Sequence, residues 1–235
     1  MQVFKFGGAS VKSAENIKNV TTIISRYKSS ALLVVVSAIN KTTNKLEELT
    51  KAYYYQNGDY LGLLEEVKVD HFTILNELFE DPNHPVYDDL SNSFVEIEWI
   101  LEEEPQDTYD YLFDQIVSLG EIISSKILAA YSTYVNIPTR WVDARDYICT
   151  DNTYREGKVD WPQTEDRIRR DIPAILDEQV IITQGFIGST SENFTTTLGR
   201  EGSDYSAAIF ASCLNAEDIT IWKDVPGVLN ADPKW

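Results

Sequence analysis

The sequence has very few cysteines, no long apolar run and little positive charge, and each shortage excludes a class of protein. Its two cysteines, Cys149 and Cys213, are too few in 235 residues for a disulfide framework, so we expect a reducing compartment. The longest apolar run, residues 31–39, is far shorter than the roughly 20 residues that cross a bilayer. The N-terminus lacks the basic flank and apolar stretch of a signal peptide, and we expect a cytoplasmic protein.

Positive charge is scarce: 20 Lys and Arg stand against 38 Asp and Glu, which gives a net charge of −18. A chain this acidic lacks the cationic face that nucleic acids and anionic membranes require, so we expect neither as a partner. The hydrophobic fraction of 43% is ordinary for a globular protein. Any anionic ligand must therefore be held by a local cluster of donors that works against the overall field.

Strand-like and helical stretches alternate at both ends of the chain, whereas residues 42–136 are almost entirely helical. Alternation of this kind favours an α/β fold with a mainly parallel sheet covered on both faces. Residues 193–198 fit a further short strand. The clearest expected strands are 2–6, 31–38, 139–142, 179–183 and 219–222, and the clearest helices are 13–28, 107–134, 161–176 and 203–214, the last with Ser203 as its N-cap.

The first expected strand ends in two glycines. Gly7 and Gly8 would let backbone N–H groups approach an anion closely, and Lys5 would bring an ammonium to the same place. A strand-end turn with a solvent-facing lysine explains the pattern as well. The stretch is not a Walker A loop, because its lysine precedes the glycines, and it is not the dinucleotide fingerprint G-x-G-x-x-G.

Three further stretches combine glycine with charge near the end of an expected element. Residues 118–121 place Glu121 after Gly120, where it is either a helix-surface glutamate or a carboxylate for a ligand ammonium. Residues 195–204 place Arg200, suited to a carboxylate, before Asp204, which alone would be a plain charge at a helix start. Residues 222–227 could be ordinary turn chemistry. Together, the four stretches describe a site for ATP and a free amino acid.

These stretches also carry a resemblance to a known family. Residues 4–11 are similar to the aspartokinase signature K-F-G-G-T-S-V, and residues 195–207 to T-T-T-L-G-R-G-G-S-D-Y-S-A. Residues 181–188 resemble another internal motif, and residues 222–233 resemble W-T-D-V-P-G-I-Y-T-T-D-P. The four motifs occur in the family's order, from one end of the chain to the other. On them the chain resembles the catalytic domain of aspartokinases, within the amino-acid-kinase family.

The resemblance implies an amino-acid-kinase fold, a three-layer α/β/α sandwich, over residues 1–235, with a helical substrate-side region at about 42–136. It implies phosphorylation of the side-chain carboxylate of L-aspartate to 4-phospho-L-aspartate with ATP and Mg²⁺, the first step of aspartate-family biosynthesis, lysine and threonine included. The Mg²⁺ would be held largely by phosphates, so we expect no cluster of protein ligands for it. His71 and His84 are expected to be structural or exposed.

The resemblance also implies roles for individual residues. Lys5 would neutralise the transferring phosphoryl group, and Asp204 would organise the lysines and the metal–phosphate geometry. The L-aspartate pocket would be lined by Thr43, Glu121, Phe186, Arg200 and Ser203. The nucleotide would be bordered by Lys5, Gly7, Gly8, Ser10, Lys223, Asp224, Leu229 and Lys234.

The chain departs from the family pattern at several of these positions. Ala9 stands where threonine is usual, Glu201 where glycine is usual, and Lys223 where threonine is usual. Leu229 replaces a common tyrosine and Lys234 a common arginine. The family usually continues past this point with more of the kinase domain and with ACT-type regulatory domains. We therefore expect a catalytic domain that is incomplete at its C-terminus, taken from an enzyme that is a homo-oligomer at full length.

Two other functions remain compatible with the motifs. Another carboxylate kinase of the same fold would use a different acceptor, although an acetylated substrate has no ammonium for Glu121. A noncatalytic fragment could hold a nucleotide or an amino acid without transfer. The site itself would fail as a hypothesis if Lys5 and Arg200 lay in separate clefts.

Overall fold

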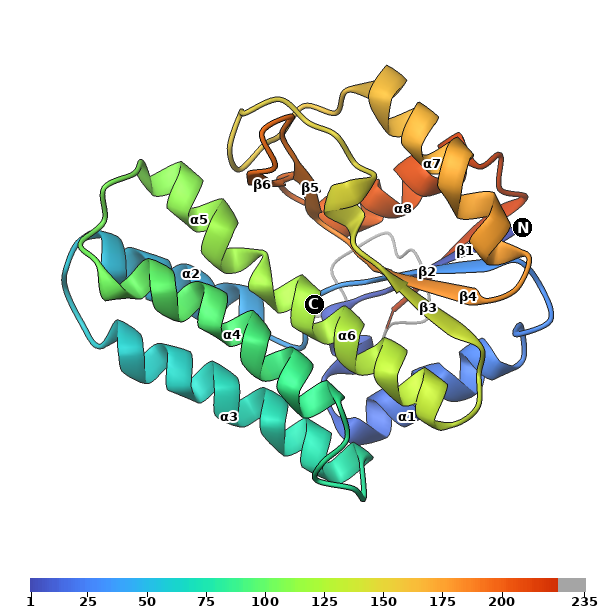
Figure 1. Cartoon of the computed structure of the whole chain (residues 1–235), viewed down its shortest axis with the longest axis horizontal. Coiled ribbons are helices and arrows are strands. Elements are labelled where there is room, and N and C mark those ends of the chain that lie inside the picture. Colours follow the sequence, from blue (N-terminus) through green and yellow to red (C-terminus); the bar gives the residue numbers. More distant parts are fainter. Residues whose placement is uncertain (224–235) are drawn as a thin grey trace, which may run out of the picture.

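A central sheet of five parallel strands organises the fold (Figure 1). The computed structural model describes residues 1–223. In sheet order the strands are β3 (Thr139–Val142), β4 (Val180–Gln184), β2 (Leu32–Val36), β1 (Gln2–Phe6) and β7 (Asp218–Trp222). The carboxyl ends of all five strands therefore meet at one edge of the sheet, where open α/β sheets bind their ligands.

The sequence of the central strands explains why the sheet is buried on both faces. All five residues of β2 are apolar and buried, as is typical of a parallel strand covered by helices on each side. Successive side chains alternate between the faces. Phe4 and Val34 pack into one core cluster, while Val3 and Leu33 pack into the other.

Helices cover both faces of the sheet (Figure 1). The helices α1 (Ala14–Ser25) and α6 (Leu119–Tyr134) lie on one side, and α7 (Trp161–Leu176) and α8 (Gly202–Cys213) lie on the other. The expected three-layer α/β/α sandwich on a mainly parallel sheet is confirmed. Of the expected helices, residues 161–176 match α7 in full, whereas the expected helix at 13–28 ends already at Ser25.

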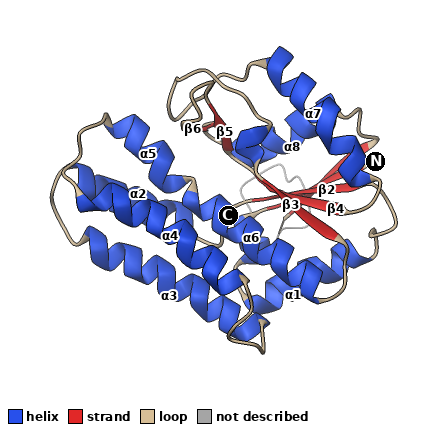
Figure 2. Cartoon of the chain, in the orientation of Figure 1, coloured by secondary structure: helices blue, strands red, loops and turns tan. Residues whose placement is uncertain are grey.

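A group of helices extends the molecule beyond the sheet (Figure 2). It consists of α2 (Thr42–Tyr54), α3 (Tyr60–Leu78), α4 (Val86–Glu102) and α5 (Tyr109–Val117). Their apolar faces share one core cluster with β1, β2 and α1, so the helical region is continuous with the sandwich. We call this group the helical lobe.

The expected single helix at 107–134 is wrong in one respect, because it divides at Ser118 into α5 and α6. The two halves pack on different partners: α5 lies against α2 and the short strand β6 (Thr195–Thr197), whereas α6 lies against the sheet. The turn at Ser118 lets each half follow its own partner. An apolar repeat cannot reveal this division, because both halves are buried with the same period.

A hairpin and two short turns complete the fold around the strand ends. The strands β5 (Ile187–Ser189) and β6 pair antiparallel, and residues 8–11 and 144–146 form the 3₁₀ turns η1 and η2. Ser203 is not the N-cap of the helix after residue 199: α8 begins at Gly202, and Glu201 precedes it in a left-handed conformation. The hydroxyl of Ser203 is thus inside the first turn of α8.

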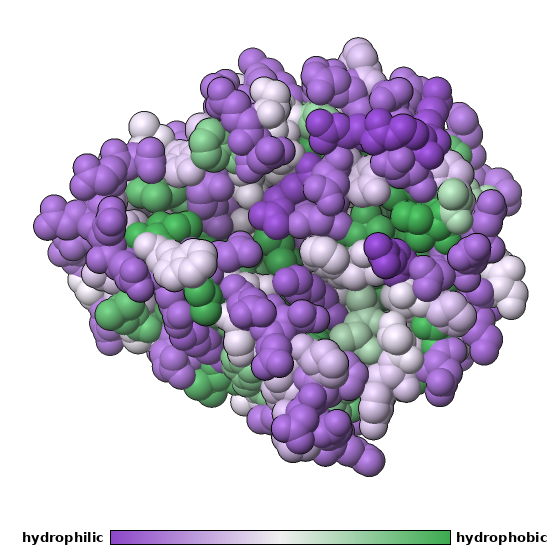
Figure 3. Space-filling model, in the orientation of Figure 1, coloured by the Kyte–Doolittle hydropathy of each residue, from purple (hydrophilic) through white to green (hydrophobic). Residues whose placement is uncertain are grey.

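The molecular face in Figure 3 is largely hydrophilic, with scattered apolar patches. His71 is buried, and Cys149 and Cys213 are buried free thiols. Among residues 1–223, no helix combines the length and the apolar character needed to cross a membrane.

Candidate active site

A cleft of about 550 Å³ opens at the carboxyl end of β1. It is bordered by the end of β2, the first turns of α2 and α8, and the start of α6. Sequence-predicted residues from five separate segments of the chain meet in it. Its lining includes Lys5, Thr43, Glu121, Phe186, Arg200, Ser203 and Asp204. Lys5 and Arg200 therefore share one cleft, which is the arrangement that the site hypothesis requires.

Lys5 faces α8 because side chains alternate along β1. Val3 packs among the side chains of α8, and Lys5, two residues on, points to the same side of the sheet. The Lys5 Nζ lies 2.7 Å from Asp204 Oδ1, and both side chains are largely shielded from water. Lys223 Nζ approaches the other carboxylate oxygen of Asp204 at 3.7 Å. One carboxylate thus pairs with two ammonium groups at the cleft.

Glu121 is a buried carboxyl in the first turn of α6. The helix approaches the end of β2 so closely that a Cβ on Gly120 would lie 2.9 Å from Ala38 Cβ. Glu121 Oε1 accepts a hydrogen bond from the Ala38 N–H at 3.3 Å, and Oε2 has no partner among the described residues. Loss of solvent raises the pKa of Glu121 to about 8, although the Ala38 N–H and the nearby Lys5 oppose the rise. Among residues 1–223, no donor faces Oε2, and a ligand ammonium would supply one.

Arg200 stands on a strained loop between β6 and α8. Gly199 has φ +74° and Glu201 has φ +56°, and Phe186 across the cleft has φ +70°. Positive φ costs a residue with a Cβ about 1 kcal/mol or more, and such residues gather at functional sites. The Arg200 side chain is exposed and makes no ion pair with any residue in 1–223. Its guanidinium is therefore available to a carboxylate.

The glycine turn after β1 does not line the cleft, although the sequence predicts that it borders the nucleotide. Gly7, Gly8 and Ser10 are not among the residues that line the cleft. Gly8 packs so tightly that a Cβ there would lie 2.5 Å from the Ala38 carbonyl oxygen, and Ser10 N–H donates to Gly7 O. Only Gly7 adjoins the Lys5 ammonium, with 3.7 Å between Nζ and the place of a Cβ. The role of this turn in holding phosphates remains a prediction.

Part of the predicted nucleotide border cannot be placed. Lys223 ends the described chain just after β7 and reaches Asp204. Asp224, Leu229, Lys234 and the turn expected at 226–227 lie outside the described residues. Among residues 1–223, no three His, Cys, Asp or Glu side chains gather in a group that could hold a metal ion.

The structure adds lining residues that the sequence analysis did not name: Ser37, Asn44 and Glu47. Thr43 and Glu47 lie four residues apart on α2 and so share one face of that helix. Ser37 is the polar residue that interrupts the apolar run 31–39 at the end of β2. The sequence could have indicated two of these residues. Glu47 follows from its spacing to Thr43, and Ser37 follows from its position at the end of the strand.

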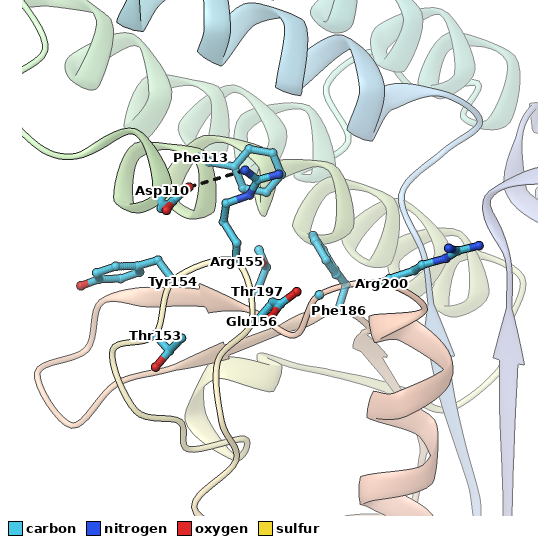
Figure 4. Close-up of a pocket in the computed structure, with 10 residues that line it drawn as sticks. Asp110, Phe113, Thr153, Tyr154, Arg155, Glu156, Phe186, Thr197 and Arg200 are labelled. Carbon is cyan, nitrogen blue, oxygen red and sulfur yellow. Dashed lines mark ion pairs between the residues drawn. The ribbon is translucent and has the colours of Figure 1, made fainter.

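A second pocket, of about 620 Å³, adjoins the cleft and shares Phe186, Gly199 and Arg200 with it. Figure 4 shows Arg155 and Arg200 on opposite sides of Phe186. Arg155 reaches toward α5, where its Cζ lies 4.4 Å from the centroid of the Phe113 ring. Arg200 lines both this pocket and the cleft that holds Lys5.

Comparison with known proteins identifies the family of this chain. A model described as the amino acid kinase family matches residues 1–235. Lysine-sensitive aspartokinase 3 of Escherichia coli is 32% identical over 232 residues, which cover 99% of this chain and 51% of that protein. A chloroplastic bifunctional aspartokinase/homoserine dehydrogenase of Zea mays is 32% identical over 240 residues, covering 99% of this chain and 26% of that protein.

A solved structure supports the same assignment. The crystal structure of E. coli aspartokinase III in complex with aspartate and ADP matches with a TM-score of 0.91 and 31% identity. The match covers 100% of this chain and 51% of that one. The chain thus spans between about a quarter and about half the length of the relatives it matches. The resemblance predicted from the motifs is confirmed, and the chain belongs to the amino acid kinase family.

Proposed function

We propose that this chain is the part of an aspartate kinase that binds L-aspartate and transfers the γ-phosphoryl group of ATP to its side-chain carboxylate. The product is 4-phospho-L-aspartate. The observation that carries the proposal is the single cleft in which the Lys5–Asp204 ion pair lies with Glu121 and Arg200. The relative of known structure was solved with aspartate and ADP, which supports the same pair of ligands here.

The two charged ends of the amino acid have matching partners in the cleft. Glu121 would accept the α-ammonium, because its buried Oε2 lacks a donor in the described structure. Arg200 would bind the α-carboxylate through paired N–H donors. Thr43, Phe186 and Ser203 line the same cleft and would fix the carbon chain. The side-chain carboxylate is then left to face Lys5.

Little covalent help is needed for the transfer itself. The attacking carboxylate is ionised at neutral pH, since an aspartate side chain has a pKa near 3.9, so no general base is required. Phosphoryl transfer depends on positioning and on neutralising charge around the phosphoryl oxygens. Lys5 supplies that charge at the cleft, and Asp204 holds its ammonium in place at 2.7 Å. Lys223 would add a second cation on the nucleotide side.

Mg²⁺ would enter with the nucleotide. It prefers oxygen ligands and is held in kinases by one or two carboxylates together with substrate phosphates. Asp204 pairs with Lys5 in the described structure, and it would organise the lysines around the metal-bound phosphates. When bound, the ion would neutralise phosphate charge in addition to that neutralised by Lys5 and Lys223.

We also propose that the reaction is the first step in the synthesis of aspartate-derived amino acids, lysine and threonine among them, and that it takes place in the cytoplasm. We propose further that the full-length enzyme is a homo-oligomer. The name of the lysine-sensitive relative supports the link to lysine.

Release of ADP, coupled to NADH oxidation, tests the proposal. Turnover should need L-aspartate and should fail with N-acetyl-L-aspartate, which has no ammonium for Glu121. Arg200→Ala should weaken L-aspartate binding by about 10-fold to 100-fold, because charge-assisted hydrogen bonds contribute about 1.5–3 kcal/mol. Arg167→Ala, at a partly exposed arginine on α7 that donates to the Asp146 carbonyl oxygen, is the matched control. Turnover with another acceptor but not with L-aspartate would contradict the proposal.

A further inference from the structure

Within residues 1–223, the strand that leads to Arg200 has no neighbouring strand on its outer edge. In this part of the chain β6 pairs with β5 along one side, with Thr195 opposite Ser189 and Thr197 opposite Ile187. On the other side lies helix α5, which has no free backbone donors or acceptors to offer a strand. Side chains of α5 take the place of the missing strand.

Gln115 supplies the first pair of bonds. Its Nε2 donates to the carbonyl oxygen of Thr195 at 2.8 Å, and its Oε1 accepts from the Thr195 N–H at 3.2 Å. One side-chain amide thereby makes the two hydrogen bonds that a partner residue on an adjacent strand would make. Because both bonds go to backbone groups, the identity of residue 195 has no part in them.

Asp114 supplies the next set. Oδ2 accepts from the Thr197 N–H at 2.9 Å and Oδ1 accepts from the Thr197 hydroxyl at 2.7 Å. Oδ2 also accepts from the Arg155 N–H at 2.9 Å. The Asp114 side chain is fully buried, and burial raises its pKa to about 6, so it is ionised and accepts all three bonds above neutral pH.

The remaining backbone group on the outer edge of β6 also has a hydrogen-bond partner. The carbonyl oxygen of Thr197 accepts from the Gly157 N–H at 2.8 Å. The segment that contains Gly157 is itself fixed to α5, because the Arg155 guanidinium stacks on Phe113 and lies 3.5 Å from Asp110 (Figure 4). Residues 155–157 and 195–197 are therefore both anchored on one helix of the helical lobe.

We infer that Asp114 and Gln115 are positioning residues that fix the backbone from which Arg200 reaches the amino-acid substrate. Arg200 follows Thr197 by only three residues, and its exposed side chain has no ion-pair partner within residues 1–223 to hold it. The anchored strand and the Leu198 N–H, which donates to Phe186 O at 2.8 Å, set where the Arg200 loop begins. The inference rests on the proposed function, in which Arg200 binds the α-carboxylate.

Hydrogen–deuterium exchange tests the anchoring without any ligand. In Asp114→Asn, an amide NH₂ replaces an acceptor that faces N–H groups, so amide exchange at residues 195–200 should speed up by about 10-fold or more. Asp88→Asn, at an exposed aspartate on α4 of the helical lobe, is the control for converting one carboxylate to an amide away from the hairpin. Equal exchange at 195–200 in wild type and Asp114→Asn would overturn the inference.

Ligand binding tests the consequence for Arg200. Calorimetry should show that Asp114→Asn and Gln115→Ala weaken L-aspartate binding about 10-fold, with ATP affinity within about twofold of wild type. Equal losses for both ligands would indicate a general loss of structure and would contradict a positioning role. If wild-type protein binds no L-aspartate while the exchange result holds, the proposed function fails and the anchoring stands.

Two variants at Thr197 disturb the structure less than Asp114→Asn does, and they keep the inference testable if Asp114→Asn does not fold. Thr197→Val removes only the hydroxyl bond to Asp114, whereas Thr197→Ser keeps it. L-aspartate affinity should fall in the valine variant and be restored in the serine variant. The same affinity in both variants would contradict the role of Asp114.

Discussion

Lys5 Nζ lies 2.7 Å from Asp204 Oδ1, although the two residues are separated by almost the whole described chain. The pair joins the end of β1 to the first turn of α8. It holds the ammonium at the opening of the cleft in which Glu121 and Arg200 also lie.

Lys5→Ala should separate binding from turnover. Because the ammonium acts on charge at the phosphoryl group, kcat should fall by about 10²-fold to 10³-fold, as for other preorganised charge donors. L-aspartate affinity should change little, since its own charged groups face Glu121 and Arg200. Lys18→Ala, a lysine of α1 that reaches only the Glu77 carbonyl oxygen, is the control for losing one positive charge. Unchanged kcat in Lys5→Ala would contradict the role of this lysine.

Glu121→Gln should stabilise the ligand-free protein at high pH. Burial raises the pKa of Glu121 from 4.5 to about 8, so the folded state binds the proton more tightly than the unfolded chain does. The free energy of unfolding therefore falls as the pH rises from about 4.5 to 8, by on the order of 5 kcal/mol at 1.36 kcal/mol per unit. Glutamine resembles the protonated form and escapes this loss.

Urea denaturation measures the difference. Glu121→Gln should match wild type near pH 5 and exceed it by several kcal/mol near pH 8.5. Glu47→Gln, at a partly exposed glutamate on α2 that also lines the cleft, serves as the comparison and should show no such gain. A constant difference between Glu121→Gln and wild type across this range would rule out a raised pKa at Glu121.

Binding of L-aspartate should release a proton. In the free cleft Glu121 is mostly protonated at pH 7, because its pKa is about 8, and the ligand ammonium pairs with the ionised form. The dissociation constant should therefore fall roughly tenfold per unit from pH 6 to 7 and level off above about 8. Calorimetry in buffers of different ionisation enthalpy should count close to one proton released at pH 6.5. Binding without proton release would place the ammonium elsewhere.

Glu201→Gly should raise stability. Glu201 adopts φ +56°, which costs a residue with a Cβ about 1 kcal/mol and costs glycine almost nothing. Its side chain makes no cap hydrogen bond to α8 that would be lost. Glu201→Ala keeps the strained conformation and is the matched control, so only the glycine variant should gain about 1 kcal/mol in denaturation. Equal gains in stability for both variants would show that the charge of Glu201, and not its backbone strain, destabilises the wild-type protein.

The sequence predicted strands and helices correctly where the residue pattern was local or repeated. β-branched runs predicted β2 and β4. Alternation along β1 places Lys5 on the same side of the sheet as Val3, and in the structure this side faces α8. The cleft residues were identified by motif, and the structure brings Lys5, Glu121, Arg200 and Asp204 together. The left-handed Glu201 was not predicted, because the search for an N-cap favoured Ser203 by residue type.

The contacts between the helical lobe and the hairpin could not be predicted in the same way. Asp114 and Gln115 lie within an apolar repeat and look like helix-surface residues. Most of their partners on the hairpin are backbone groups about 80 positions away in the chain. A bond to a backbone group leaves no mark in the residue type of the partner. The division of the helix at Ser118 is hidden for a related reason, since the partners of α5 and α6 differ only in three dimensions.

The most direct test of the account is to trap the product. Protein, Mg-ATP and L-aspartate are incubated with hydroxylamine, which attacks an acyl phosphate, releases phosphate and leaves a hydroxamate on the same carbonyl carbon. Mass spectrometry should find the side-chain hydroxamate of L-aspartate with wild-type protein, and about 10²-fold less with Lys5→Ala. A hydroxamate that forms on another acceptor but not on L-aspartate would contradict the central claim.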